Sequence, residues 1–172
     1  MGVSGCGKST VGALLARELT LPFLEGDSLH PAENVALMAA GHPLDDEHRR
    51  PWLDLVGAWL ADGPPDGTGG GVAACSALAR RYRDQLRAHD PQAWFLHLEV
   101  DREVVLRRVS GRRGHYMPAS LVDSQLATLE PLAPDEAGVR LSAELPVRQV
   151  VRLAAEALRA DPATGWIRPG AG

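Results

Sequence analysis

The first ten residues constrain the fold of this chain more strongly than any other segment. Residues 2–9 read Gly-Val-Ser-Gly-Cys-Gly-Lys-Ser and satisfy the pattern G-x-x-x-x-G-K-S/T in full. Directly behind this pattern, an apolar helix face is indicated by the spacing of Val11, Leu14, Leu15 and Leu19. A glycine-rich turn that runs into a helix directs backbone N–H groups and the positive helix end at one point, which suits a phosphate group. We therefore expect a nucleoside triphosphate site here, and we disfavour the alternative of an ordinary glycine-rich turn.

Lys8 is the only lysine in the chain, and the other 17 of the 18 basic residues are arginine. This bias indicates that position 8 needs a compact ammonium group rather than a planar guanidinium group. In this pattern Lys8 neutralises the β- and γ-phosphates and Ser9 binds Mg²⁺, so ATP and Mg²⁺ are the expected cofactors. The thiol of Cys6 lies among amides at a helix start, so we expect alkylation to inactivate the protein and ATP to protect it. The expected phosphate-binding set is completed by Gly2, Ser4, Gly5, Cys6, Gly7 and Thr10.

Predicted strands and helices alternate along the rest of the chain. Short apolar segments predict strands at 22–25, 72–75, 94–100 and 139–141. Amphipathic segments predict helices at 32–40, 45–60, 78–88, 102–112, 120–129 and 147–158. This alternation is typical of an α/β fold with a parallel sheet and helices on both faces. We expect a single domain over residues 1–160 and a flexible tail over residues 161–172.

Composition excludes several classes of protein. The net charge of −4 argues against a duplex-binding surface, so no nucleic-acid partner is expected. No apolar run approaches the ~18 residues that a membrane span needs, and we expect a soluble, cytoplasmic protein without a membrane partner. The two cysteines form neither a disulfide framework nor a zinc motif.

The start of the chain is short for a loop of this kind. Such a loop ordinarily follows a buried strand of about five residues, but only Met1, Gly2 and Val3 are available for it. We expect the natural reading frame to begin upstream, and the alternative is a central strand reduced to a stub. If the chain is the whole molecule, we expect a destabilised sheet and a poorly held loop.

Charged side chains near predicted strand and helix ends are candidates for the remaining chemistry. Glu25 and Asp27 follow the predicted strand at 22–25, where one carboxylate can hold Mg²⁺ through water and the other can accept the proton of an acceptor hydroxyl. The alternative is a polar strand end without function. Arg49 and Arg83 can flank the same crevice and bind a substrate carboxylate between them.

A second arginine pair follows the predicted strand at 94–100. Arg108 and Arg112 are four residues apart on one predicted helix, and can lie over ATP when a flap closes. A solvated arginine pair is the alternative. His30 and His115 each lie beside a glycine- or proline-bearing turn and are weaker candidates for substrate contact.

The chain resembles the bacterial gluconokinases in several blocks that occur in order between residue 2 and about residue 131. The phosphate loop is the least specific of these blocks. The others are residues 26–31 (Gly-Asp-Ser-Leu-His-Pro), 43–46 with Arg49 and 51–53, 75–78 with 82–84, and 112–117 with 124–125 and 128–131.

The resemblance implies a three-layer P-loop kinase fold of the nucleoside-monophosphate-kinase type, with parallel strand order 2-3-1-4-5, a truncated first strand and a lid at about 111–131. It implies transfer of the γ-phosphoryl group of ATP to the 6-hydroxyl of D-gluconate, and a possible homodimer. By position, Asp27 would bind or activate the acceptor hydroxyl and Arg49 and Arg83 would hold gluconate. Arg108 and Arg112 would act from the lid, Arg112 as a catalytic residue with Lys8 and Asp27. Ser9 would bind Mg²⁺ directly and Glu25 through water, while His30 and His115 would contact substrate.

The chain departs from the family pattern at three points. The first strand is missing, Ala79 stands where the family usually has Lys, and Glu25 stands where Asp is commoner. We expect Arg80 to replace the missing lysine. Two other functions stay open: a related kinase of another small hydroxy acid such as shikimate, and a degenerate nucleotide-binding protein without turnover.

Overall fold

Two short parallel sheets meet at the N-terminus of the chain. The computed structural model describes residues 1–64, 70–110 and 119–164. In one sheet β1 (Phe23–Glu25) pairs with β2 (Val72–Ala74), and in the other β3 (Phe95–Glu99) pairs with β4 (Gly138–Ser142). These strands confirm those predicted from apolar segments.

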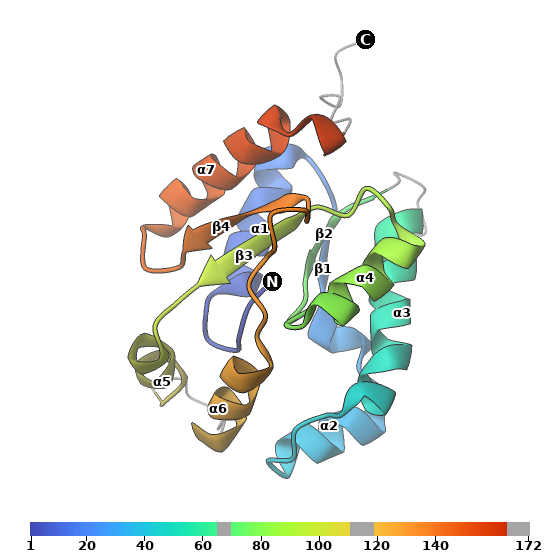
Figure 1. The fold of residues 1–172 in the computed structure, drawn as a ribbon, viewed down its shortest axis with the longest axis vertical. Helices are drawn as coiled ribbons and strands as arrows, with labels where there is room; N and C mark the ends of the chain where they lie inside the picture. Colours follow the sequence, from blue (N-terminus) through green and yellow to red (C-terminus); the bar gives the residue numbers. More distant parts are fainter. Residues whose placement is uncertain (65–69, 111–118, 165–172) are drawn as a thin grey trace.

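Residues 1–3 join the two sheets. The N–H of Leu98 in β3 donates to the carbonyl of Met1 at 3.0 Å, and the N–H of Gly2 donates to the carbonyl of Ser76, just beyond β2, at 3.2 Å. The N-terminal segment therefore lies between β2 and β3, and when it is counted as the first strand the order is the predicted 2-3-1-4-5 (Figure 1).

Helices cover both faces of the strands, as the alternating pattern predicts (Figure 1). The helices α1 (Lys8–Leu19) and α7 (Val147–Ala160) pack on each other, and α3 (Asp46–Asp62) packs on α4 (Arg80–His89). The remaining helical elements are α2 (Ala32–Ala39), α5 (Arg102–Ser110), α6 (Ala119–Thr128) and the 3-10 turns η1 (Gly26–Leu29) and η2 (Pro162–Thr164).

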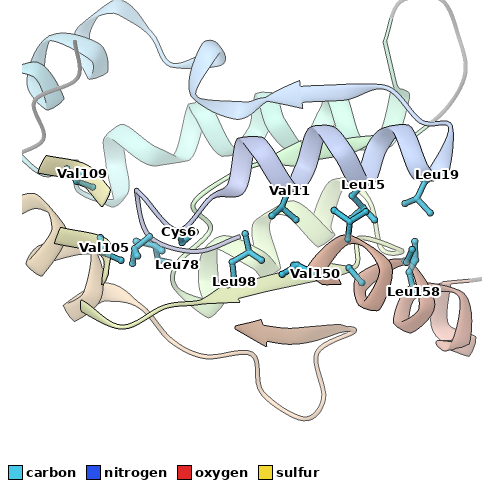
Figure 2. Packing of buried hydrophobic residues seen from close by; sticks show 14 of the residues in the cluster. Cys6, Val11, Leu15, Leu19, Leu78, Leu98, Val105, Val109, Val150 and Leu158 are labelled. Carbon is cyan, nitrogen blue, oxygen red and sulfur yellow. The ribbon is translucent and has the colours of Figure 1, made fainter. Parts of the chain in front are cut away.

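The larger core lies between α1, α7 and the strands. Figure 2 shows Val11 and Leu15 of α1 directed toward Leu98 of β3 and Val150 of α7. All four side chains are buried. Because α1 begins at Lys8, the same packing that buries this apolar stripe fixes the start of the helix, and with it the phosphate loop.

The smaller core lies on the opposite face, between α3, α4 and the strands. It contains Trp52 and Val56 of α3, Tyr82 and Leu86 of α4, and Phe95 of β3. Phe95 and Leu98 point to opposite faces of β3, as the period of a strand requires. The two cores together make the three layers that the resemblance implied.

A cavity of about 290 Å³ lies between the two sheets on the side where the chain begins. Its lining includes Val72 and Ala73 of β2, Phe95 and Leu96 of β3, and Met1. In the parallel pairing of Met1 with β3, the direction that leads away from Gly2 points along Leu96 and Phe95. The cavity therefore continues the path of the N-terminal segment.

The C-terminal residues that the structure describes are attached to the body of the protein. The indole N–H of Trp94 donates to Asp161 at 3.0 Å, and the hydroxyl of Thr164 donates to the carbonyl of Leu158 at 3.2 Å. The expected flexible tail thus has an ordered beginning, and residues 165–172 of it lie outside the described residues. Among the described residues, no helix has the length and apolar character needed to cross a membrane.

Candidate active site

The phosphate loop takes the left-handed backbone conformations that glycine allows. Gly5 and Gly7 have φ angles of +83° and +102°. Gly7 is the N-cap of α1 and no side chain caps the helix, so the first-turn N–H groups remain available to an anion. The ammonium group of Lys8 folds over the loop and donates to the carbonyl of Val3 at 3.1 Å. The loop therefore has the geometry of an anion cradle, with one cation beside it.

A residue that sequence reasoning did not assign to the site contacts this loop. The N–H of Ser4 donates to Oε1 of Gln125 in α6 at 2.6 Å. The helix α6 is linked to α5 by an ion pair between Arg102 and Asp123, with 2.7 Å between Nε and Oδ1. Gln125 belongs to a block that resembles gluconokinases, but only the fold reveals that its carboxamide reaches the loop.

A cavity of about 470 Å³ lies beside the phosphate loop, on the side of α5 and α7. Its lining includes Gly7 and Thr10 of the loop region, Arg108 of α5, and Ala143 and Pro146 of the connection from β4 to α7. The guanidinium group of Arg108 donates to the carbonyl of Ala143 at 2.9 Å. The position of Arg108 next to the loop fits its predicted place near a nucleotide.

The two predicted carboxylates lie at the end of β1. Glu25 is the last residue of β1, and Asp27 follows in η1 with an exposed side chain. Gly26 between them is required by close packing, since a Cβ there would be 2.6 Å from the carbonyl oxygen of Ala74. Burial raises the pKa of the Cys75 thiol to about 11, and both Asp27 and Lys8 act on it electrostatically. Asp27 and Lys8 are therefore both close to the end of β2.

The residues present suit a magnesium ion that is held jointly with a nucleotide. Ser9, with an exposed side chain at the start of α1, supplies a hydroxyl, and Glu25 and Asp27 supply carboxylates. Oxygen ligands of this kind are those that Mg²⁺ prefers, usually alongside phosphate oxygens. Within the described ranges, no group of three or more His, Cys, Asp or Glu side chains is placed to hold a metal ion by itself.

His30 stacks on Trp52 beside Asp27. The two ring centroids are 4.1 Å apart at an interplanar angle of 18°, and the indole N–H of Trp52 donates to the carbonyl of Gly26 at 2.7 Å. The Nε2 atom of His30 is 4.0 Å from Oδ1 of Asp27. His30, predicted as a weak candidate, is therefore placed directly beside the candidate acceptor-binding carboxylate.

Arg49 faces the same corner of the molecule. Its Nε donates to the carbonyl of Leu44 at 3.1 Å, and its guanidinium carbon lies 5.4 Å from the centre of the Tyr82 ring. Burial lowers the pKa of His30, and the positive charge of Arg49 lowers it further, against an opposing effect of Asp27. Among the ion pairs of the described residues Arg49 has no carboxylate partner, so its outer nitrogens are available to an anionic ligand.

The structure corrects the prediction for Arg83. This side chain is 0 % exposed and pairs with Glu136, with 2.7 Å between Nε and Oε1. Its other nitrogens donate to carbonyl groups, including those of Leu78 and Glu130, both at 3.1 Å. The hydrogen bonds from Arg83 are the main reason that the pKa of Glu136 is lowered to about 2. Arg83 therefore anchors α4 to the segment that follows α6, and it does not line a substrate crevice with Arg49.

Two further expectations are also corrected. Arg80, expected to replace the missing lysine at position 79, has its guanidinium engaged by Asp135 at 2.6–2.8 Å. Ala79 itself is buried at the start of α4. Cys6 is 1 % exposed and packs under the loop, where a Cβ on Gly2 would be 2.9 Å from its sulfur. In this conformation the thiol is not accessible to an alkylating reagent.

The predicted lid lies partly outside the described residues. Arg112 and His115 fall in the segment 111–118, which the structure does not describe. The described part of the lid region consists of α6 and the residues that follow it, where the N–H of Glu130 donates to the carbonyl of Leu78 at 2.9 Å.

Comparisons with known proteins agree with this geometry. The family model described as shikimate kinase matches residues 4–130. A sugar kinase from Janibacter sp. HTCC2649 has a similar structure, with a TM-score of 0.86 and 47% identity over 95% of this chain and 94% of that chain. A gluconokinase from Sinorhizobium meliloti 1021 has a TM-score of 0.83 and 42% identity over 92% of this chain and 89% of that chain. The fold and the loop define a P-loop kinase.

The curated relatives identify the group of kinases. The chain is 49% identical over 144 residues to the gluconokinase of Gluconobacter oxydans (strain 621H), which covers 84% of this chain and 80% of that protein. It belongs to the gluconokinase family.

Proposed function

We propose that this protein transfers the γ-phosphoryl group of ATP to the 6-hydroxyl of D-gluconate. The observation that carries the proposal is the position of Asp27, which lies with Lys8 near the end of β2 while His30 and Arg49 face the same corner. This arrangement provides a carboxylate for an acceptor hydroxyl and a guanidinium group for a sugar acid, next to an anion cradle.

The loop and its lysine would bind the triphosphate. The free N–H groups at the start of α1, together with those of Ser4 and Gly5, would hold phosphate oxygens, and Lys8 would leave the carbonyl of Val3 to neutralise the transferring group. The base would occupy the cavity of about 470 Å³ that Arg108 borders. Arg112 would add positive charge from the lid, as predicted from the sequence.

The acceptor would bind at the carboxyl end of β1. Asp27 would accept a hydrogen bond from the attacking hydroxyl and take its proton as the bond to phosphorus forms. Arg49 and His30 would contact the carboxylate and hydroxyl groups of gluconate, with His115 as a further contact. Mg²⁺ held by Ser9, and through water by Glu25, would supply charge neutralisation at the β- and γ-phosphates.

An ADP-release assay with three acceptors tests the proposal. Release should depend on gluconate, and should be negligible with shikimate or with water as the acceptor. The product should be identified by NMR as 6-phosphogluconate, and a Lys8→Met variant serves as the inactive control. Release that depends on shikimate instead would favour the second kinase function, and ATP binding without release would favour a degenerate protein. A cytoplasmic location and a homodimer remain predictions.

A further inference from the structure

Asn34 is a buried polar residue outside the set predicted to act in the site. It lies in α2 and is 3 % exposed. Its side-chain nitrogen Nδ2 is 2.8 Å from the carbonyl oxygen of His48 in α3 and 3.3 Å from Nδ1 of His30. One amide group thus connects α2 with α3 and with the ring beside Asp27.

The carbonyl of His48 determines which way the Asn34 amide points. A carbonyl oxygen only accepts hydrogen bonds, so the Asn34 atom 2.8 Å away from it has to be the NH₂ group and not the amide oxygen. The same NH₂ group carries a second hydrogen, and His30 Nδ1 is the other atom within its reach. The amide is therefore a donor toward both partners.

This donor determines the tautomer of His30. A ring nitrogen that accepts a hydrogen bond is unprotonated, so in a neutral imidazole the proton lies on the other nitrogen, Nε2. Burial lowers the pKa of His30, which keeps the ring neutral at pH 7. The Nε2 atom is the one 4.0 Å from Oδ1 of Asp27, so the ring presents an N–H to this carboxylate and to a ligand bound beside it.

The plane of the ring is fixed as well. Trp52 stacks on it at 4.1 Å, and Trp52 is itself held by its hydrogen bond to Gly26. With Nδ1 bound by Asn34 and one face covered by Trp52, rotation of the ring would break one contact or the other. The direction of the Nε2–H group is therefore set from both sides.

We propose that Asn34 is a positioning residue for phosphoryl transfer, because it holds His30 as the Nε2–H tautomer and so presents a hydrogen-bond donor beside Asp27. This inference rests on the proposed function for its kinetic part, since Asp27 is the group that would accept the proton of the acceptor. With the other tautomer, the lone pair of Nε2 would face the carboxylate and repel it.

The tautomer is measured directly by NMR. In long-range ¹H–¹⁵N spectra of the ¹⁵N-labelled protein at pH 7.5, His30 should show an unprotonated Nδ1 and a protonated Nε2, with its signals assigned by their loss in His30→Gln. A protonated Nδ1 in the unmodified protein would overturn the proposal. This measurement needs no substrate, so it decides the positioning role even if gluconate proves not to be the acceptor.

The kinetic test uses Asn34→Leu, which keeps the approximate volume and removes both donors. We expect His30 signals from both tautomers, a decrease in kcat of about tenfold and a change of less than about twofold in KM for ATP. Ala36→Gly is the matched control, because Ala36 is exposed on the same helix and glycine loosens α2 without touching the ring. It should leave both the tautomer and kcat unchanged.

A double-mutant cycle separates positioning from general support of the fold. Glutamine at position 30 offers an N–H group near the place of Nε2 and has no tautomers, so in the His30→Gln background Asn34→Leu should change kcat by less than about twofold. A persistent tenfold loss in that background would show that Asn34 acts through α2 and α3 instead of through His30, and would overturn the proposal.

Discussion

The N–H of Ser4 in the phosphate loop donates a hydrogen bond of 2.6 Å to the side-chain oxygen of Gln125 in α6. The carboxamide thus uses one of the loop amides on which phosphate binding depends. A phosphate oxygen that binds the Ser4 amide has to displace Gln125, and α6 is linked through Arg102 and Asp123 to the helix that carries Arg108. Phosphate binding and the position of α6 are therefore coupled.

Replacement of Gln125 by leucine should tighten nucleotide binding. The variant lacks the acceptor that competes for the Ser4 amide, and a neutral hydrogen bond is worth about 1 kcal/mol, so Kd for ADP should fall about fivefold in isothermal titration calorimetry. Gln85→Leu is the control, because Gln85 bonds to Asp54 in α3, away from the loop. Weaker binding by the Gln125 variant would instead make this residue a ligand of the nucleotide.

Arg49 should contribute to acceptor binding and not to nucleotide binding. In Arg49→Gln we expect KM for gluconate to rise roughly tenfold or more, because a charge-assisted hydrogen bond is worth about 1.5–3 kcal/mol. KM for ATP should stay within about twofold. Arg50→Gln is the matched control, since Arg50 is adjacent and exposed. Equal effects of the two changes on KM for gluconate would contradict the assignment.

Arg83 should be a residue of stability. Arg83→Met leaves the Glu136 carboxylate buried without its main partner, and removal of one member of a buried pair costs about 3–5 kcal/mol of unfolding free energy. Urea denaturation measures the loss. The exposed pair of Arg152 and Glu156 offers a contrast, because Arg152→Met should cost about 0.5 kcal/mol or less. A stable Arg83 variant with a raised KM for gluconate would restore the prediction made from the sequence.

Acidification should destabilise the protein through His97. This side chain is 1 % exposed in β3, neither ring nitrogen has a hydrogen-bond partner among the described residues, and burial lowers its pKa to about 4. The unfolded chain, with the ordinary histidine pKa near 6.5, takes up the proton first, so stability is lost as the pH falls from about 6.5 toward 4.

The loss can be measured by urea denaturation between pH 7 and pH 5. His97→Leu should remove most of the decline, whereas His89→Gln should retain it, since His89 lies at the surface beside Asp54. Below pH 4.5 a second decline begins, because the lowered pKa of Glu136 makes its protonation unfavourable in the folded state. An unchanged slope in His97→Leu would exclude His97 as the cause of the first decline.

An apolar extension in front of Met1 should stabilise the fold. About four strand-forming residues would follow the parallel path along β3 and fill the cavity of about 290 Å³ between β2 and β3. Filling a cavity and pairing two strand edges should raise the unfolding free energy by at least about 2 kcal/mol. An extension of equal length made of Gly and Ser is the control, and equal melting temperatures for the two would contradict this account of the cavity.

The layers and the strand order could be predicted because local patterns were strong. The helices α1 and α7 carry regular apolar faces, and β3 is the clearest apolar run, so their positions followed from periodicity alone. Helix α3 continues through Pro51, and its capping residue Asp45, which accepts from the N–H of His48 at 3.0 Å, agrees with the predicted start.

The site was predicted only in part because its supporting contacts are distant in sequence. The motif identifies the phosphate loop, but the partner of Ser4 is 121 residues away. Arg83 was misassigned because a sequence does not show whether an arginine finds a carboxylate, and Glu136 lies 53 residues further on. Asn34 and Trp52 look like ordinary helix residues, and only the fold brings them to His30.

The segment from Met1 to Val3 has two mechanical duties. It is the seam that holds one half of the sheet to the other, and it leads without interruption into the loop that grips the nucleotide. Any ligand that immobilises the loop therefore also draws the halves together. In this protein, the affinity for the phosphoryl donor and the cohesion of the whole molecule are two readings of one equilibrium.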